Sequence, residues 1–263
     1  MADPVRLAMW NGPRCRSTAL LRAWQSRADT VGVDEPLYGV YLAHTDVDHP
    51  ARASVLAEYA TDWRDVVAEL TGPAPGGAPI WYQKHMAHHL LPHVGRDWLD
   101  DGFRHAFLIR DPAALVVSLA KVIPEPGLLD TGLPQQVELF ERFSASGPTP
   151  PVVDADDLLR APGLVLAALS DRLGVAFDPA MLAWAPGRRD TDKTWTEHWY
   201  ASVWRSTGFG RHELREVVVP DALRPLVEEA DELYARLRPH SLRVDRGPGT
   251  EDRSGDGPYR EVS

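Results

Sequence analysis

Short apolar runs, separated by longer stretches with helical periodicity, are the dominant pattern of this chain. The runs are nearly continuous in apolar residues, as expected of strands that are buried on both faces. They predict strands at Val5–Trp10, Val31–Val33, Ile80–Met86, His105–Arg110 and Val152–Asp154. Each of these runs is short, which fits the usual length of a strand in a globular protein.

The intervals between the predicted strands read as helices. Val55, Tyr59, Trp63 and Leu70 share one face of such an interval. The predicted helices are Ser17–Arg27, Ser54–Leu70, Ala113–Val122, Gln135–Ser144, Pro162–Leu173 and a closing helix at Pro220–Leu237. Strands that alternate with helices favour parallel pairing. The sequence therefore predicts an α/β fold, a doubly wound parallel sheet with helices on both faces.

The chain of 263 residues is long enough to bury one good-sized core. No internal repeat or linker divides it, so residues 1–244 are predicted to form a single α/β domain. The last segment, residues 245–263, is rich in glycine, proline and charge. Such a composition buries too little apolar surface to order itself, which predicts a disordered tail.

Charge and cysteine content narrow the classes of function. The formal net charge of −10 argues against nucleic acid or an anionic membrane as the main partner. Cys15 is the single cysteine, so no intramolecular disulfide is expected. No apolar run approaches the roughly 18 residues of a membrane span, and the start lacks the features of a signal peptide. These features together predict a cytoplasmic protein that binds anions only where its positive groups converge.

The first such place follows the first predicted strand. The segment Asn11–Thr18 leads into a helix, and the free amides at a helix N-terminus bind phosphate or sulfate. Arg14 and Arg16 add positive charge, and Ser17 and Thr18 add hydroxyl donors. The pattern G-x-x-x-x-G-K-[ST] of nucleoside triphosphatases is absent. An alternative role for Ser17 or Thr18 is to cap the helix.

A second candidate anion site lies where the fourth predicted strand ends. Arg110 stands at the strand tip, Pro112 fits the first position of the next helix, and Ser118 lies about two turns into it. Ligands of open parallel sheets bind at the carboxyl ends of strands, where both candidate sites fall. The alternative is an ordinary surface ion pair between Arg110 and Asp111.

These segments resemble the P-loop sulfotransferase family, in its bacterial sulfotransferase-like branch. Pro13–Thr18 is similar to the 5′-phosphosulfate loop, although Cys15 and Arg16 depart from the pattern at its two middle positions. Arg110 and Ser118 have the spacing of the pair that binds the 3′-phosphate of the donor. The resemblance implies that the donor is 3′-phosphoadenosine 5′-phosphosulfate (PAPS), with Arg14–Thr18, Arg110 and Ser118 as its ligands and the bisphosphate PAP as the product.

The resemblance extends to about residues 5–240. The segment Pro186–Trp195 is similar to a late basic loop that closes over the donor, which implies Arg188, Arg189 and Lys193 as further donor-binding residues. The alternative is that these basic residues balance an acidic surface. The tryptophans at positions 184, 195, 199 and 204, together with Tyr200, are candidates to frame the acceptor pocket. The spacing of Trp195, Trp199 and Trp204 instead favours a helix that packs on the core, and packing is favoured for at least two of them.

Two residues at strand ends are candidates for the base that takes the proton of the acceptor. Glu35 follows the second predicted strand, and some sulfotransferase branches use a glutamate there. His85 ends the third strand, where many members carry Lys-x-His; here Lys84 and His85 are adjacent, so they face opposite sides of the strand. We favour Glu35 as the base and Lys84 as the cation that contacts the sulfuryl group. His85, His88 and His89 remain the alternatives, and a capping role is the alternative for Glu35.

Other chemistry is less well supported by the sequence. His85 and His89 have a zinc-like spacing, but no third ligand stands out, so no metal is expected. Cys15 lacks an adjacent base and is interpreted as a residue of the donor loop. The predicted function is transfer of a sulfuryl group from PAPS to a hydroxyl or amine of a small-molecule acceptor. The alternatives are a P-loop small-molecule kinase and a catalytically inactive nucleotide-binding domain. Residues 36–50, 86–100 and 124–134 are predicted to form the acceptor pocket.

Overall fold

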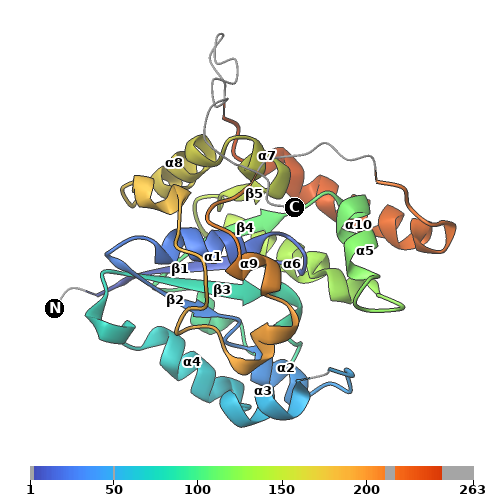
Figure 1. Ribbon diagram of the computed structural model, residues 1–263, viewed down its shortest axis with the longest axis horizontal. Coiled ribbons are helices and arrows are strands. Elements are labelled where there is room, and N and C mark those ends of the chain that lie inside the picture. The colour runs from blue at the N-terminus through green and yellow to red at the C-terminus, as the bar shows by residue number, and fades with distance from the viewer. Residues whose placement is uncertain (1–2, 50, 211–216, 245–263) are drawn as a thin grey trace, which may run out of the picture.

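The computed structural model describes residues 3–49, 51–210 and 217–244 (Figure 1). Its centre is a five-stranded sheet in the order β2-β3-β1-β4-β5, in which every neighbouring pair is parallel. The strands are β1 (Val5–Asn11), β2 (Thr30–Asp34), β3 (Ile80–Met86), β4 (Phe103–Ile109) and β5 (Val152–Asp154). All five predicted strands are therefore present.

Helices cover both faces of this sheet, which confirms the predicted doubly wound α/β fold (Figure 1). Alternate residues of β1 enter different cores: Leu7 and Met9 on one face, Ala8 and Trp10 on the other. The first core is completed by α1 (Ser17–Gln25), α5 (Pro112–Leu119) and α8 (Pro162–Arg172). The second is completed by α4 (Trp63–Thr71), α6 (Leu133–Ser146) and α10 (Arg224–Leu237).

The single helix predicted over Ser54–Leu70 is wrong. The segment forms two helices, α3 (Arg52–Glu58) and α4, separated at Tyr59, whose backbone is extended. The Tyr59 hydroxyl accepts a hydrogen bond from the Trp195 indole at 2.9 Å. Asp62 then caps α4 by accepting from the amide of Arg64 at 2.9 Å. A long-range contact and a local cap therefore override the helical periodicity.

Several short elements were not predicted from the sequence. They are the helices α2 (Tyr38–Ala43), α7 (Ala155–Arg160) and α9 (Ala201–Trp204), and the 3₁₀ turns η2 (Ala87–His89), η4 (Leu128–Thr131) and η6 (Thr194–His198). The predicted tail, residues 245–263, lies outside the described residues. In the described ranges, no helix is both long and apolar enough to span a membrane.

The register of the sheet places the loops that follow β1, β2, β3 and β4 at one edge. Asn11, at the end of β1, lies opposite Met86 of β3 and Leu108 of β4. The Asn11 side chain donates to the carbonyl oxygen of His85 at 2.7 Å, which ties the ends of β1 and β3 together. The candidate residues of the sequence therefore gather at the carboxyl edge of the sheet.

Candidate active site

The turn between β1 and α1 has the geometry of an anion-binding loop. Arg14 (φ 63°) and Arg16 (φ 66°) both adopt the left-handed conformation that is uncommon outside glycine. This backbone brings the chain sharply from the strand into α1, whose first residue is Ser17. Among the described residues, no side-chain hydrogen bond caps the N-terminus of α1, so the suggested capping role of Ser17 or Thr18 is not observed. The N-terminus of the helix remains available for a negatively charged group.

Arg14, Arg110 and Ser118 come together beside this loop. The Nε of Arg14 donates to the hydroxyl of Ser118 at 3.0 Å, and the guanidinium of Arg110 donates to the carbonyl oxygen of Arg14 at 2.8 Å. Partial burial and the charge of Arg110 lower the pKa of Arg14. Among the described residues, no carboxylate pairs with either arginine. Two like charges held this close form a site that a bound anion would stabilise.

Cys15 contributes to the loop through its backbone. Its side chain is 1% exposed, lies in the core against α1 and β1, and has a pKa raised to about 12 by burial. A thiol with such a pKa is not a thiolate nucleophile. The neighbouring Arg16 is exposed, so the residues of the loop alternate between core and solvent.

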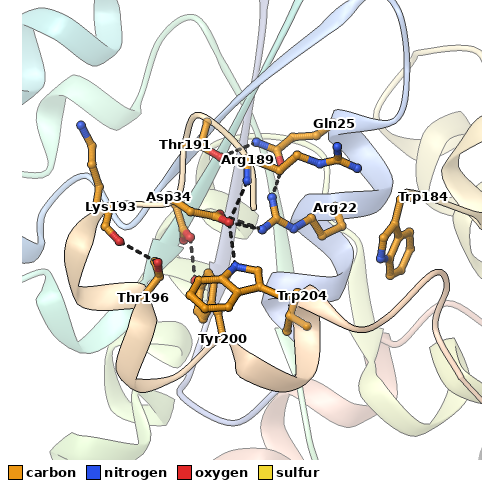
Figure 2. Close-up of polar contacts among 12 residues, drawn as sticks. Arg22, Gln25, Asp34, Trp184, Arg189, Thr191, Lys193, Thr196, Tyr200 and Trp204 are labelled. Atoms are coloured by element: carbon orange, nitrogen blue, oxygen red, sulfur yellow. Dashed lines mark hydrogen bonds and ion pairs between the residues drawn. The ribbon is translucent and has the colours of Figure 1, made fainter. Parts of the chain in front are cut away.

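Lys84, Asp34, Glu35 and Tyr200 form a buried polar cluster at the ends of β2 and β3. The ammonium of Lys84 donates to Asp34 Oδ1 and Glu35 Oε1, both at 2.7 Å, and to the Tyr200 hydroxyl at 3.1 Å. Tyr200 in turn donates to Asp34 Oδ2 at 2.6 Å, as Figure 2 shows. Because a lysine ammonium has three donors, all of them are used here. This geometry argues against the expected contact of Lys84 with a sulfuryl group and makes it a partner of Glu35.

Glu35 stands at the tip of β2 with an unusual backbone conformation, φ 48°. Its amide donates to the carbonyl oxygen of Lys84 at 2.9 Å, so the residue continues the contact between β2 and β3. Burial raises the pKa of the Glu35 carboxyl, Lys84 opposes this shift, and the charge of Asp34 adds to it. A carboxylate with a raised pKa is better suited to accept a proton than an ordinary glutamate.

His85 points to the opposite face of β3, as its adjacency to Lys84 predicted. Its ring stacks on Trp10 with centroids 4.4 Å apart, and its Nε2 lies 3.2 Å from the side-chain oxygen of Gln83. The residue is 1% exposed, and burial lowers its pKa to about 3. The geometry therefore makes His85 a residue of the core beneath α4 and α6, and this argues against the expectation that it is a base.

His88 and His89 follow β3 in the turn η2. The ring of His89 stacks on Tyr38 and on Tyr41, with centroids 4.7 Å apart in both cases. Burial lowers the pKa of His88 to about 4 and that of His89 well below its usual value, so both rings are neutral at pH 7. In the described part of the chain, no three or more histidine, cysteine, aspartate or glutamate side chains gather in a way that could hold a metal ion.

The basic segment after Pro186 contacts α1, Tyr59 and α9 rather than the two arginines of the anion site. Arg188 pairs with Glu197 at 2.8 Å, and Lys193 lies over the ring of Tyr59. The backbone amide of Arg189 donates to Asp192 at 2.9 Å. The predicted donor-binding role of Arg188, Arg189 and Lys193 thus has no support from their contacts.

Sequence reasoning missed the buried polar contacts that Asp192 and Tyr200 of this segment make. Asp192 accepts two hydrogen bonds from one guanidinium nitrogen of Arg22 in α1, at 2.7 and 2.5 Å, and both side chains are buried. The Trp204 indole donates to the same carboxylate at 2.9 Å. No local pattern marks these contacts, because the partners are far apart in the chain. Asp192 lies 170 residues from Arg22, and Tyr200 lies 166 residues from Asp34.

The features that define the class of this protein are a parallel α/β sheet, a loop with anion-binding geometry after β1, and Arg110 at the tip of β4, the strand beside β1 in the sheet. Residues 5–237 match the family described as the sulfotransferase domain. The chain belongs to this family. The resemblance inferred from Pro13–Thr18, Arg110 and Ser118 is thereby confirmed.

Solved structures show the same fold. The sulfotransferase domain of the Synechococcus PCC 7002 olefin synthase aligns with a TM-score of 0.59 at 20% identity, over 89% of this chain and 96% of that one. A sulfotransferase from Alicyclobacillus acidocaldarius aligns with a TM-score of 0.55 at 12% identity, over 91% and 96%. At these identities the likeness concerns the fold.

Two curated relatives from Arabidopsis thaliana are closer in sequence. Branched-chain-amino-acid aminotransferase-like protein 1 is 35% identical over 240 residues, which are 91% of this chain and 43% of that protein. Branched-chain-amino-acid aminotransferase-like protein 2 is 31% identical over 231 residues, which are 88% and 41%. The chain thus spans less than half the length of these relatives, and their names do not define its activity.

Proposed function

We propose that this protein is a PAPS-dependent sulfotransferase that acts on a hydroxyl or amine of a small molecule. The observation that carries the proposal is the convergence of Arg14, Arg110 and Ser118 beside the open N-terminus of α1. In this proposal the helix N-terminus binds the 5′-phosphosulfate, together with the hydroxyls of Ser17 and Thr18. Arg110 and Ser118 bind the 3′-phosphate.

Glu35 is the base in this proposal. The tips of β1 and β2 are separated by one strand, hence by about 10 Å, which leaves room for the sulfuryl group and the acceptor between them. The bond between sulfur and the bridging phosphate oxygen of the donor breaks while the bond from the acceptor atom to sulfur forms. The acceptor proton passes to the Glu35 carboxylate, and the leaving phosphate stays at the N-terminus of α1.

Lys84 is a positioning residue in this mechanism. It fixes the Glu35 carboxylate through a 2.7 Å ion pair, while Asp34 and Tyr200 occupy its other two donors. The positive charge of Lys84 favours the ionised form of Glu35, and burial keeps that carboxylate basic. Catalysis then depends mainly on positioning and on charge stabilisation, as expected of a loose transition state.

Calorimetry with PAP tests the proposal. The wild-type protein should bind PAP, and Arg110→Ala should weaken binding by about 10- to 100-fold, because a hydrogen bond to a charged group contributes about 1.5–3 kcal/mol. Adenosine 5′-phosphate lacks the 3′-phosphate, so its affinity should change little in the same variant. Arg64→Ala removes an equal charge from the exposed face of α4 and serves as the control.

Three results would count against the proposal. Undetectable binding of PAP to the wild-type protein would end it. An equal loss of affinity for PAP and for adenosine 5′-phosphate in Arg110→Ala would remove the proposed role of Arg110. Turnover of magnesium-ATP by the purified protein would favour a kinase instead.

A further inference from the structure

A cavity of about 690 Å³ is lined by residues of the turns η2 and η4 and of the segments next to them. Three segments supply most of its lining. Tyr41 lies in α2 and Thr45 just after it, a second group between His88 and Arg96 follows β3, and a third between Leu129 and Pro134 lies in and after η4. They fall within the three segments that the sequence assigned to the acceptor pocket without defining its chemistry. The volume falls within the range of about 300–1,000 Å³ that is typical of small-molecule sites.

The cavity adjoins the anion-binding loop through η4. A methyl group placed on Gly12, at the start of the loop, would lie 2.1 Å from the carbonyl oxygen of Thr131, the last residue of η4. His88 lines the cavity and follows β3, the strand that carries Lys84. The turn η4 therefore borders both the cavity, through Leu129 and Asp130, and the anion-binding loop, through Thr131.

Much of the lining is apolar. It includes Leu90, Leu91, Pro92, Val94 and Leu129, and the last of these is 65% exposed. The ring of Tyr41 adds an aromatic surface and meets His88 edge to face, with centroids 5.2 Å apart. These groups favour a ligand whose body is itself apolar.

Arg96 is the cation among the described lining residues, and it cannot bind an anionic ligand because its N–H groups already have partners. All five N–H groups of Arg96 are used: two bind the carboxylate of Glu138, at 3.0 and 3.3 Å, and three bind the carbonyl oxygens of Leu90, Leu91 and Val94. Glu138 is in turn neutralised by Arg96. This pair therefore leaves the net charge of the lining to Asp130.

Among the described residues that line the cavity, Asp130 carries the remaining charge. One of its carboxylate oxygens accepts a hydrogen bond from the amide of Gly127 at 2.8 Å. The charge of Asp130 also acts on Tyr41, whose pKa is raised to about 12, mainly by burial and secondarily by Asp130. His88 is neutral at pH 7 and brings no compensating charge. An uncompensated carboxylate beside an aromatic ring attracts a cation.

We propose that this cavity binds an acceptor with an apolar body and a protonated amine, with the amine at Asp130 and Tyr41 and the body against Leu90, Leu91 and Leu129. The inference rests on the proposed function in calling this ligand the acceptor. The group that receives the sulfuryl group is then a different one, a hydroxyl directed towards the anion-binding loop.

Three probes that share one frame test the charge preference: 4-phenylbutylamine, 4-phenylbutanol and 4-phenylbutyrate. Calorimetry on the full chain, with and without PAP, should show the amine binding at least threefold more tightly than the alcohol and the carboxylate binding most weakly. Asp130→Asn should remove the advantage of the amine and leave the affinity of the alcohol unchanged. Asparagine keeps an oxygen for the amide of Gly127, so the fold of η4 is retained.

Asp65→Asn is the matched control, since it removes an equal charge from the exposed face of α4. The proposal is overturned if the amine and the alcohol bind equally, if the carboxylate binds best, or if Asp130→Asn and Asp65→Asn have the same effect. The failure of PAP to bind, with the amine preference intact, would refute the proposed function and leave the cation site standing. Binding of PAP without any amine preference would refute this inference alone.

Discussion

Lys84 carries one positive charge between two carboxylates in a site with almost no solvent. The exposed fractions of Lys84, Asp34 and Glu35 are 1%, 3% and 8%. The cluster therefore holds one excess negative charge whenever both carboxyls are ionised, and burial of that charge is unfavourable. The raised pKa of Glu35 reflects this cost, because burial and the charge of Asp34 disfavour the ionised form of its carboxyl.

This arrangement predicts how Glu35 affects stability across pH. A carboxyl whose pKa is raised in the folded state stabilises the fold below its unfolded value of about 4.5, and that contribution is lost as pH rises through the folded value. Glu35→Gln removes the ionisation. Its free energy of unfolding relative to the wild type should therefore increase from pH 4.5 to pH 8, by about 1.4 kcal/mol for every tenfold difference in proton affinity between the folded and unfolded carboxyl.

Urea unfolding at several pH values measures this difference. Glu69→Gln, on the exposed surface of α4, is the matched control and should show no such trend. A difference between Glu35→Gln and the wild type that stays constant over this range would show that Glu35 keeps an ordinary pKa, and the argument for it as a base would weaken.

At the scale of elements, two buried polar contacts help to fix the segment from Arg189 to Trp204 to the rest of the molecule, in addition to the contacts of Lys193 and Trp195 with Tyr59. Asp192 binds Arg22 of α1 and the indole of Trp204, and Tyr200 binds the cluster of Lys84. Figure 2 shows Tyr200 and Trp204 of this segment together with Arg22 and Asp34. The segment therefore positions Tyr200, and through it one of the donors of Lys84.

Asp192→Asn should loosen this segment. A buried ion pair that loses one partner leaves an uncompensated charge, which typically costs about 3–5 kcal/mol. The amides of Thr196, Trp199 and Tyr200, which are bonded within and around η6, should exchange with solvent at least tenfold faster. Hydrogen exchange followed by mass spectrometry measures this effect.

The exposed Asp190→Asn is a control for the change of charge in the same segment. If it alters exchange as much as Asp192→Asn, the pair with Arg22 does not hold the segment. A loss of stability below about 1 kcal/mol in Asp192→Asn, which is the range of an exposed ion pair, would lead to the same conclusion.

At the scale of the whole molecule, the anion-binding loop packs closely against η4, the turn whose Leu129 and Asp130 line the proposed acceptor cavity. Gly12 of the loop faces the carbonyl oxygen of Thr131, a residue that is completely buried. Only a residue without a side chain allows this approach. Changes at Gly12 should therefore disturb both binding sites together.

Gly12→Ala tests this coupling. Its methyl group would lie 2.1 Å from the Thr131 oxygen, so either the loop or η4 must move. Overpacking of this kind costs about 1–3 kcal/mol, and we expect PAP affinity to fall at least tenfold. Calorimetry and urea unfolding measure the two effects.

Gly163→Ala provides the contrast, because its added methyl group finds its nearest neighbour, Leu182, at 3.8 Å and lies in α8. That variant should be at least as stable as the wild type and bind PAP normally. Normal PAP binding by Gly12→Ala would show that the loop tolerates the shift and that the two sites are independent.

Much of the fold was predictable because it depends on local patterns. The apolar runs at Val5–Trp10, Ile80–Met86 and Val152–Asp154 coincide with strands. Their alternation with helices predicted parallel pairing, which the structure confirms. The break at Tyr59 was not predictable, because it depends on Trp195, a residue 136 positions away.

The candidate site divides in the same way. The local sequence was enough to predict the anion site of Asn11–Thr18, Arg110 and Ser118, because adjacent residues define a loop between a strand and a helix. The opposite orientations of Lys84 and His85 followed from strand geometry alone. The ion pairs that occupy Lys84, and the contacts of Arg188, Arg189 and Lys193 away from the anion site, did not follow from any local pattern.

The sequence by itself determined the parallel sheet, the loops that follow its strands and the gathering of positive groups at the strand tips. The periodicity of apolar residues and the adjacency of residues in the chain encode these features. Only the tertiary structure decided which charges are neutralised by distant partners: Lys84 by Asp34 and Glu35, Asp192 by Arg22, and Arg96 by Glu138. The physical reason is that the strength and availability of a charge depend on burial and on neighbours in space.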